Sequence, residues 1–347
     1  MRETLRARVE DVTQTGEARR LVTSLCRDLG FSELDIGRVS LVVTEAATNL
    51  VRHARGGELL FRPLELAGKT GLEILSLDRG PGMSNPARSL RDGYSTAGSP
   101  GTGLGALGRA SSSFDLFSEL ETGTVLACRY WPSPPGDVPF RPLETGVVCL
   151  SMTEGEPCGD TWAVAPGASK SSVLVCDGLG HGLLAAEASR LAERLFRELR
   201  PRGPAETVEA LHQGLRGTRG AALAVLEADH SNGVVRYCGV GNIGARIVEG
   251  ESERHMVSYG GIVGQEVRKM QEFSYPWPEG ALLVLHSDGL ATSWHLSSHP
   301  GLASHHPSVV AAVLVRDFRR GRDDTTVLVA RRRAPLEGRI EPDEGTA

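Results

Sequence analysis

The sequence predicts an α+β protein of two domains, the first a mixed sheet with helices on one face and the second a β-sandwich flanked by helices. The chain has 347 residues, which is long for one hydrophobic core. Residues 131–142 read WPSPPGDVPFRP, and proline fixes φ and lacks an N–H donor, so this stretch suits a linker. The motifs on its two sides differ. We therefore expect domains at 1–132 and 144–333, a linker at 133–143 and a flexible tail at 334–347.

Composition and charge exclude several classes of protein. Hydrophobic residues make up 40% of the chain and charged residues 23%, which is ordinary for a globular protein. The formal net charge of -5 gives no reason to expect nucleic acid or a membrane as a partner. The N-terminus has no apolar segment, the apolar runs are too short to span a bilayer, and the six cysteines form no CxxC pair. We expect a protein of the reducing cytoplasm.

Helical and strand patterns alternate through the first domain. Apolar residues recur at helical spacing from Ala18 to Leu29. Ser32 precedes Glu33 and Asp35, which is typical of a helix N-cap with acids in the first turn. Apolar runs then predict strands at 58–66, 72–77, 114–120 and 124–131.

Short strands dominate the second domain. An amphipathic helix is predicted at 183–199, with an apolar stripe from Leu184 to Leu199. The predicted strands lie at 147–152, 161–165, 172–176, 221–227, 234–237, 281–286 and 325–330.

Three pieces of the first domain fit ATP chemistry. Glu45 and Asn49 are four residues apart on one predicted helix, so they share a face, where Asn can hold Mg²⁺ and Glu can act as a general base. Asp78 follows an apolar strand and can accept the adenine amino group, while Gly80 and Gly82 let the backbone approach the base. The third piece is a glycine-rich loop before a helix, which presents free N–H groups to phosphates: Gly101, Thr102, Gly103, Leu104 and Gly105. Singly each is weak, since Glu45 alone reads as a solvated charge, but their order favours a nucleotide site.

The motifs ExxxN, DxGxG and GTGLG resemble those of the GHKL ATPase and kinase superfamily, over roughly residues 10–131. Residues 92–98 (DGYSTAG) most resemble the small serine kinases of the anti-sigma group, of the RsbT type. The resemblance implies a Bergerat α/β sandwich. It also implies that Asp78 binds adenine, that Asn49 holds Mg²⁺ and that Glu45 activates the attacking serine hydroxyl. Gly101, Gly103 and Gly105 would form the ATP lid.

Acidic residues stand at the ends of apolar strands throughout the second domain. Their positions are Asp160, Asp177, Asp288, and the pair Asp323 and Asp324. One Asp at a strand end is usually a turn former, but four such sites in one domain favour binding of hard cations. Two divalent ions could share a water and lower its pKa for attack on phosphorus. No cysteine lies in a CxxxxxR phosphate loop, so no thiol nucleophile is expected.

The motifs GD, DGLGHG, SDG and DDTT resemble the PPM, or type 2C, phosphatases in their SpoIIE, RsbU and RsbX branch, over about residues 145–331. The resemblance implies that Asp160 and Asp177 bridge two Mn²⁺ or Mg²⁺ ions with help from the Gly178 carbonyl. Asp288 and Asp323 would complete the shell, with Asp324 the ligand instead if the register shifts by one. The arginine that eukaryotic members use for substrate has no counterpart here.

Other polar clusters have plainer interpretations. We expect His181 to be structural and the arginines of 316–322 to form a solvated face. An exposed flap, rather than a metal site, is expected for the irregular histidine cluster of His286, His295, His299, His305 and His306.

Two functions fit these patterns. The first is a bifunctional protein serine/threonine kinase and metal-dependent phosphatase, acting on STAS-domain proteins of a stressosome or partner-switching module. In the second, the ATP-binding half only sequesters a sigma factor or downstream activator, and the phosphatase is the sole enzyme. Intact Glu45 and Asn49 favour the first.

Overall fold

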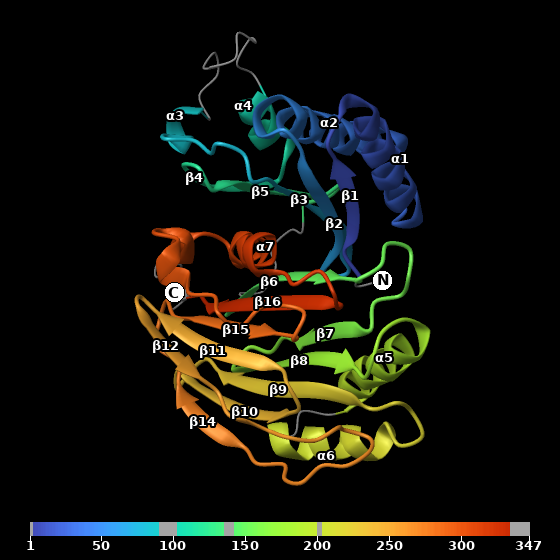
Figure 1. The fold of residues 1–347 in the computed structure, drawn as a ribbon, viewed down its shortest axis with the longest axis vertical. Coiled ribbons are helices and arrows are strands. Elements are labelled where there is room, and N and C mark those ends of the chain that lie inside the picture. The colour runs from blue at the N-terminus through green and yellow to red at the C-terminus, as the bar shows by residue number, and fades with distance from the viewer. Residues whose placement is uncertain (1–2, 90–102, 135–141, 200–202, 334–347) are drawn as a thin grey trace, which may run out of the picture.

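The computed structural model describes residues 3–89, 103–134, 142–199 and 203–333 (Figure 1). Its N-terminal sheet has the strand order β1-β2-β3-β5-β4. The strands are β1 (Leu5–Val9), β2 (Gly57–Leu66), β3 (Lys69–Leu77), β4 (Ser113–Glu119) and β5 (Gly123–Tyr130). Neighbours in this order pair antiparallel, so the expected mixed sheet is wrong. The physical reason is that short turns, as between β2 and β3 and between β4 and β5, join antiparallel strands.

Helices cover one face of this sheet. They are α1 (Val12–Asp28), α2 (Glu33–Asn49), the π-helix η1 (Leu50–Ala54), α3 (Pro86–Ser89) and α4 (Gly103–Ala110). The predicted N-cap of α2 is confirmed, because the Ser32 side chain accepts a hydrogen bond from the Asp35 N–H. Asn49 is the last residue of α2, and η1 follows it directly.

The C-terminal domain is a sandwich of two sheets around one apolar core. One sheet runs β13-β10-β9-β8-β7, with β14 also paired to β10, and the other runs β12-β11-β15-β16-β6. The first comprises β7 (Asp160–Ala165), β8 (Lys170–Gly178), β9 (Ala221–Asp229), β10 (Val234–Val240), β13 (Ser258–Tyr259) and β14 (Phe273–Pro276). The second comprises β6 (Leu143–Leu150), β11 (Gly244–Glu249), β12 (Ser252–His255), β15 (Leu282–His286) and β16 (Thr325–Arg332).

Helices flank this sandwich, as predicted. The helices α5 (Leu183–Glu198) and α6 (Pro204–Gly214) pack on the outer side of the first sheet. The helix α7 (Pro307–Phe318) covers the second, after the short 3-10 helices η2 (Leu296–Ser298) and η3 (Leu302–Ser304). Among the described residues, no helix combines the length and apolarity needed to cross a membrane.

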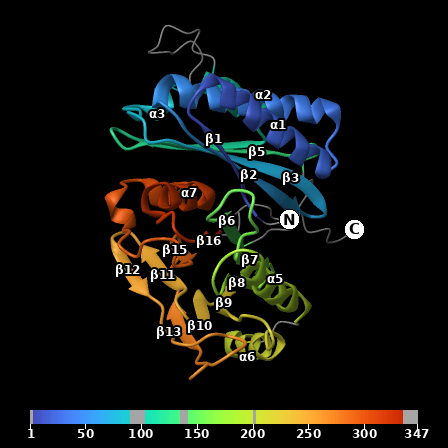
Figure 2. The same cartoon turned by 45° about the vertical axis from the view of Figure 1, so that its right-hand side comes forward.

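The helix α7 is a layer shared by the two domains (Figure 2). One hydrophobic cluster joins its buried residues to the second sheet below and to β2, β3, β4 and β5 above. The expected exposed flap and solvated arginine face are therefore wrong for His286, His299 and Arg316, whereas His295, Arg320 and Arg322 are exposed. His299 and Arg316 are buried because the apolar run of α7 needs cover on two sides and its polar neighbours are buried with it. His286 is buried at the end of β15, where Trp294 Nε1 donates to its Nε2 at 3.2 Å.

Candidate nucleotide and metal sites

Asp78 is held at the end of β3 by main-chain donors. Its Oδ1 accepts hydrogen bonds from the N–H of Gly80 at 2.8 Å and of Thr124 at 3.1 Å. Burial raises the pKa of this carboxyl, while the two amides lower it. Among the described residues, Oδ2 receives no hydrogen bond, so one acceptor oxygen is left for a ligand.

The two glycines after Asp78 are required by close contacts. A Cβ on Gly80 would lie 2.7 Å from the Cα of Ala54 in η1. Gly82 has φ of +67°, and a Cβ there would lie 2.0 Å from the Glu119 carbonyl oxygen. The turn is therefore pressed against the π-helix on one side and the end of β4 on the other.

Glu45 and Asn49 occupy the last turns of α2, and both are half-buried. The Asn49 Nδ2 is buried without a hydrogen-bond partner among the described residues. An unsatisfied amide can donate to a phosphate oxygen, or rotate to offer its own oxygen to Mg²⁺, so the site fits a metal-bound nucleotide. Of the predicted lid, Gly103, Leu104 and Gly105 begin α4, whereas Gly101 and Thr102 lie outside the described residues.

The C-terminal acids come from both sheets of the sandwich. Asp160 and Asp177 are direct partners in the antiparallel ladder of β7 and β8. Asp288 follows β15, and Asp323 and Asp324 directly precede β16, its neighbour in the other sheet. The Ser287 hydroxyl donates to Asp160 Oδ2 at 2.6 Å and so ties the two sheets together at this end.

Negative charge is crowded at this end of the sandwich. Burial first, and then the charges of Asp160, Asp288 and the Asp323–Asp324 pair, raise the pKa of Asp177. Burial also raises the pKa of Asp160, whose Oδ1 is buried without a partner among the described residues, and that of Asp288. Such a group of carboxylates fits divalent cations, which would relieve the repulsion.

The acids do not form a complete coordination shell by themselves. Among the described residues, no three His, Cys, Asp or Glu side chains are grouped closely enough to hold one ion. Mg²⁺ usually keeps several waters, and the Gly178 carbonyl at the end of β8 is a further oxygen donor. The residues therefore fit ions that retain water, not an all-protein cage.

Sequence comparison assigns both domains. Residues 9–129 match the family described as histidine kinase-like ATPase domain, and residues 168–333 match the family described as Stage II sporulation protein E (SpoIIE). The serine/threonine-protein kinase RsbT of Bacillus subtilis (strain 168) is 32% identical over 114 residues, which are 33% of this chain and 86% of RsbT. The chain belongs to the RsbT-like kinase family in its N-terminal domain.

The C-terminal domain is RsbX-like. The phosphoserine phosphatase RsbX of Bacillus subtilis (strain 168) is 24% identical over 149 residues, which are 43% of this chain and 75% of RsbX. A solved structure described as "The bacterial stressosome: a modular system that has been adapted to control secondary messenger signaling" is 29% identical with a TM-score of 0.50. The match covers 55% of this chain and 99% of the chain in that structure. The chain thus joins an RsbT-like ATPase domain to a SpoIIE-type phosphatase domain.

Within the SpoIIE-type domain, the two adjacent acids Asp323 and Asp324 have different surroundings. Asp324 is buried, and its two oxygens accept hydrogen bonds from the N–H groups of Met152 at 2.6 Å and Gly159 at 2.7 Å. Asp323 is only half-buried and accepts a bond from the Asp324 N–H at 2.9 Å. Asp324 therefore anchors the loop before β7, and Asp323 is the freer carboxylate.

Two residues of the SpoIIE-type site were missed in the sequence. Ser287 is buried, bonds Asp160, and accepts from the Thr326 N–H at 2.9 Å. Asn242 donates from Nδ2 to Asp288 Oδ2 at 2.7 Å. The signals were present, since Ser287 is the first letter of the SDG motif and Asn242 lies in a glycine-rich turn between β10 and β11.

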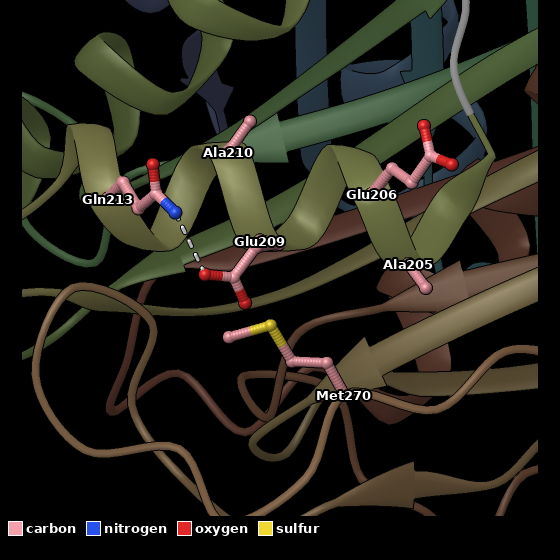
Figure 3. Close-up of a pocket in the computed structure, with 6 residues that line it drawn as sticks. All are labelled: Ala205, Glu206, Glu209, Ala210, Gln213 and Met270. Carbon is pink, nitrogen blue, oxygen red and sulfur yellow. Dashed lines mark hydrogen bonds between the residues drawn. The ribbon is translucent and has the colours of Figure 1, made fainter.

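A pocket of about 410 Å³ lies elsewhere in this domain (Figure 3). It is shallow and is lined by α6 and Met270, with Glu209 accepting a hydrogen bond from Gln213 at 3.0 Å. None of the acidic residues Asp160, Asp177 and Asp288 lines it. The candidate sites are therefore the strand ends and not this pocket.

Proposed function

We propose that the chain is a bifunctional enzyme that phosphorylates serine or threonine on a STAS-domain protein and removes the same phosphate. The observation that carries the proposal is that one chain holds both a set of residues suited to a nucleotide and a set suited to divalent cations. Glu45 and Asn49 lie in the last turns of α2, Asp78 directly follows β3, and crowded carboxylates lie at one end of the sandwich. Similarity to RsbT, and to a structure described as a stressosome, supports a partner-switching substrate.

In the kinase half, the residues divide the work by position. The free oxygen of Asp78 would accept the adenine amino group, and Asn49 would hold Mg²⁺ against the phosphates. The Glu45 carboxylate, one turn before Asn49, would take the proton of the serine or threonine hydroxyl as the hydroxyl oxygen bonds to the γ-phosphorus. The bond from that phosphorus to the β–γ bridging oxygen would break, and ADP would leave. Backbone N–H groups from Gly101 to Gly105 would contact the phosphates.

In the phosphatase half, Mn²⁺ or Mg²⁺ ions would supply a water of lowered pKa when bound. Asp160, Asp177 and the Gly178 carbonyl would hold a shared position, and Asp288 and Asp323 the outer ones. Ser287 orients Asp160, and Asn242 orients Asp288, through the hydrogen bonds described above. Asp324 would position the loop of Gly159 and would not bind the ions, since main-chain amides occupy both of its oxygens.

The domain limits form part of the proposal. We place the kinase at 1–132, the linker at 133–143, the phosphatase at 144–333 and a tail at 334–347, of which the tail and residues 135–141 lie outside the described residues. We place the protein in the cytoplasm, where ATP and reduced thiols are available. The six cysteines are buried and unpaired, in keeping with that compartment.

The decisive experiment follows phosphate on candidate substrates. The protein is incubated with ATP and with STAS-domain proteins encoded beside it, and phosphate is followed by mass spectrometry. Asp177→Ala protein should accumulate a phosphorylated STAS protein, and Glu45→Ala protein should dephosphorylate that isolated product. If the phosphatase half ignores every product of the kinase half but cleaves another phosphoprotein, the shared-substrate proposal is wrong.

A second candidate function is sequestration of a partner without phosphate transfer. Leu34 and Leu41, seven residues apart on α2 and so on one face, are 66% and 55% exposed. An apolar surface on one helix face is one way to bind a partner protein. Stable binding of a sigma factor or activator by Glu45→Ala protein, with no transfer by wild type, would favour this function.

A further inference from the structure

The N-terminal end of α7 is fixed to the kinase sheet by a buried polar cluster. Glu73 of β3 is fully buried and pairs with Arg62 at 2.6 Å and Arg129 at 2.9 Å. The Ser308 hydroxyl of α7 donates to Glu73 at 2.6 Å, and Arg129 donates to Ser308 at 3.1 Å. A buried charge cluster of this kind has few alternative arrangements, so the start of α7 is firmly placed against β3 and β5.

The C-terminal end of α7 contacts the nucleotide turn. The buried Arg316 guanidinium donates through Nη1 to the main-chain carbonyl of Asp78 at 3.3 Å. In return, the Arg79 guanidinium donates to the Arg316 carbonyl oxygen. The Arg316 side chain is also held in place by the Asp317 carboxylate, at 2.7 and 2.8 Å.

The residues that follow Arg316 contact the metal-side turn after Asp288. The Ala291 N–H donates to the Phe318 carbonyl at 2.9 Å, and the Arg320 N–H donates to the Gly289 carbonyl at 2.9 Å. Leu290 and Arg319 form an antiparallel bridge between these two bonds. Residues 316–320 therefore bond to the turn of Asp78 at one end and to the turn of Asp288 at the other.

This arrangement gives each site a mechanical path to the other. An adenine base bound to Asp78 would shift the short turn of Asp78 and Arg79. The Asp78 carbonyl and the Arg79 guanidinium in that turn are the groups that bond to Arg316. A densely packed interior does not deform continuously, so a shift at one contact moves the whole packed element. The start of α7 is fixed, so a shift would pass to its end and to the turn that carries Asp288.

We propose that the nucleotide site is also an effector site for the phosphatase. Residues 316–320 transmit the effect of nucleotide binding at the Asp78 turn to the turn that carries Asp288. The inference rests on the proposed nucleotide and phosphatase activities. It adds that ADP or ATP changes the phosphatase without any phosphate transfer. The two sites are then linked reciprocally, as any coupled pair of binding sites must be.

The first test needs no metal and no activity. Amide hydrogen exchange is measured on metal-free wild type with and without saturating ADP. ADP should change the exchange of the segments containing Ala291 and Arg320. Arg79→Ala, an exposed position, and Arg316→Lys should bind ADP but lose that change, while the matched arginine variant Arg20→Ala on α1 should keep it.

The second test measures the consequence. Hydrolysis of p-nitrophenyl phosphate is titrated with free Mn²⁺, buffered equally with and without ADP. In wild type and Arg20→Ala, ADP should shift the half-maximal Mn²⁺ concentration about 5-fold or more, the lower end of usual coupling. In Arg79→Ala and Arg316→Lys the shift should be lost, while their activity without ADP stays at the wild-type level.

The outcomes separate the inference from its basis. Suppose that wild type binds ADP and hydrolyses p-nitrophenyl phosphate, but that ADP alters neither the amide exchange at 289–291 and 318–320 nor the Mn²⁺ titration. The proposed coupling through residues 316–320 is then wrong, and the proposed function stands. The coupling is equally wrong if both arginine variants retain the full ADP effect. If calorimetry shows no ADP binding, or if Mn²⁺ supports no hydrolysis, the proposed function fails and the coupling fails with it.

Discussion

Asp160 and Asp177 stand opposite each other in the ladder between β7 and β8, so their carboxylates share one face of the sheet. The pKa of each is raised by burial and by neighbouring acids, although Ser287 donates a hydrogen bond to Asp160. Without a cation, this end of the sandwich is therefore a site of electrostatic repulsion. That relationship gives the first prediction.

Asp177→Asn should lower phosphatase activity at least about 100-fold, because the amide removes an anionic oxygen ligand. The same change should raise the melting temperature of metal-free protein, because it removes the repulsion with Asp160 and Asp288. Hydrolysis of p-nitrophenyl phosphate and thermal unfolding in chelator measure the two effects. Asp28→Asn, at the exposed end of α1, is the control. A less stable metal-free Asp177→Asn protein would contradict the proposed crowding.

Chelator should abolish the phosphatase activity, and Mn²⁺ or Mg²⁺ should restore it. Alkylation by iodoacetamide should leave the activity within about 2-fold, because all six cysteines are buried and the chemistry needs no thiol. Burial also raises the pKa of the Cys176 thiol, next to Asp177, which keeps it protonated. Rapid inactivation by the alkylating agent in native buffer would point to a thiol-dependent reaction.

Asp78→Asn should abolish nucleotide binding, because an amide places a donor where the adenine amino group needs an acceptor. Isothermal titration calorimetry with ADP measures this. Glu45→Ala should bind ADP as wild type does and lose phosphate transfer. The change removes the general base but keeps the nucleotide-binding residues Asp78 and Asn49. Undiminished affinity in Asp78→Asn would remove Asp78 from the nucleotide site.

His306 should make the interface around α7 sensitive to acid. Burial, and then the nearby Arg129 charge, lower the pKa of His306 to about 4. The unfolded chain binds a proton near the ordinary value of about 6.5, so stability is intact above that pH and falls as pH drops from 6.5 towards 4. The loss from this residue is at most about 3 kcal/mol.

His306→Asn should reduce that acid sensitivity, because its side-chain oxygen can still accept from the Ser308 N–H, as His306 Nδ1 does at 3.0 Å. Denaturant unfolding at pH 7.5 and pH 5 measures the difference for each protein. The exposed His295→Asn serves as the control. An unchanged pH dependence in His306→Asn would mean that His306 is protonated without cost in the folded state.

Local patterns were enough to predict much of the fold. Each predicted strand of the first domain overlaps an observed strand, and the predicted helix at 183–199 corresponds to α5. The predicted cap at Ser32 depends only on neighbouring residues. In contrast, β1 was missed because five residues rich in arginine carry little apolar signal, and α6 and β11–β14 were missed because short elements give weak periodicity.

The order of the motifs by itself determined which residues are candidates for nucleotide and metal chemistry, because each motif is a local signature. Only the tertiary structure distinguished Asp324, bonded by Met152 and Gly159, from Asp323. Only it showed that His299 and Arg316, expected in an exposed flap and on a solvated face, are buried. Arg316 and Asp78 are 238 positions apart, and their contact depends on how two sheets pack on one helix. Periodicity and spacing record which face of an element is apolar, but not which distant element covers it.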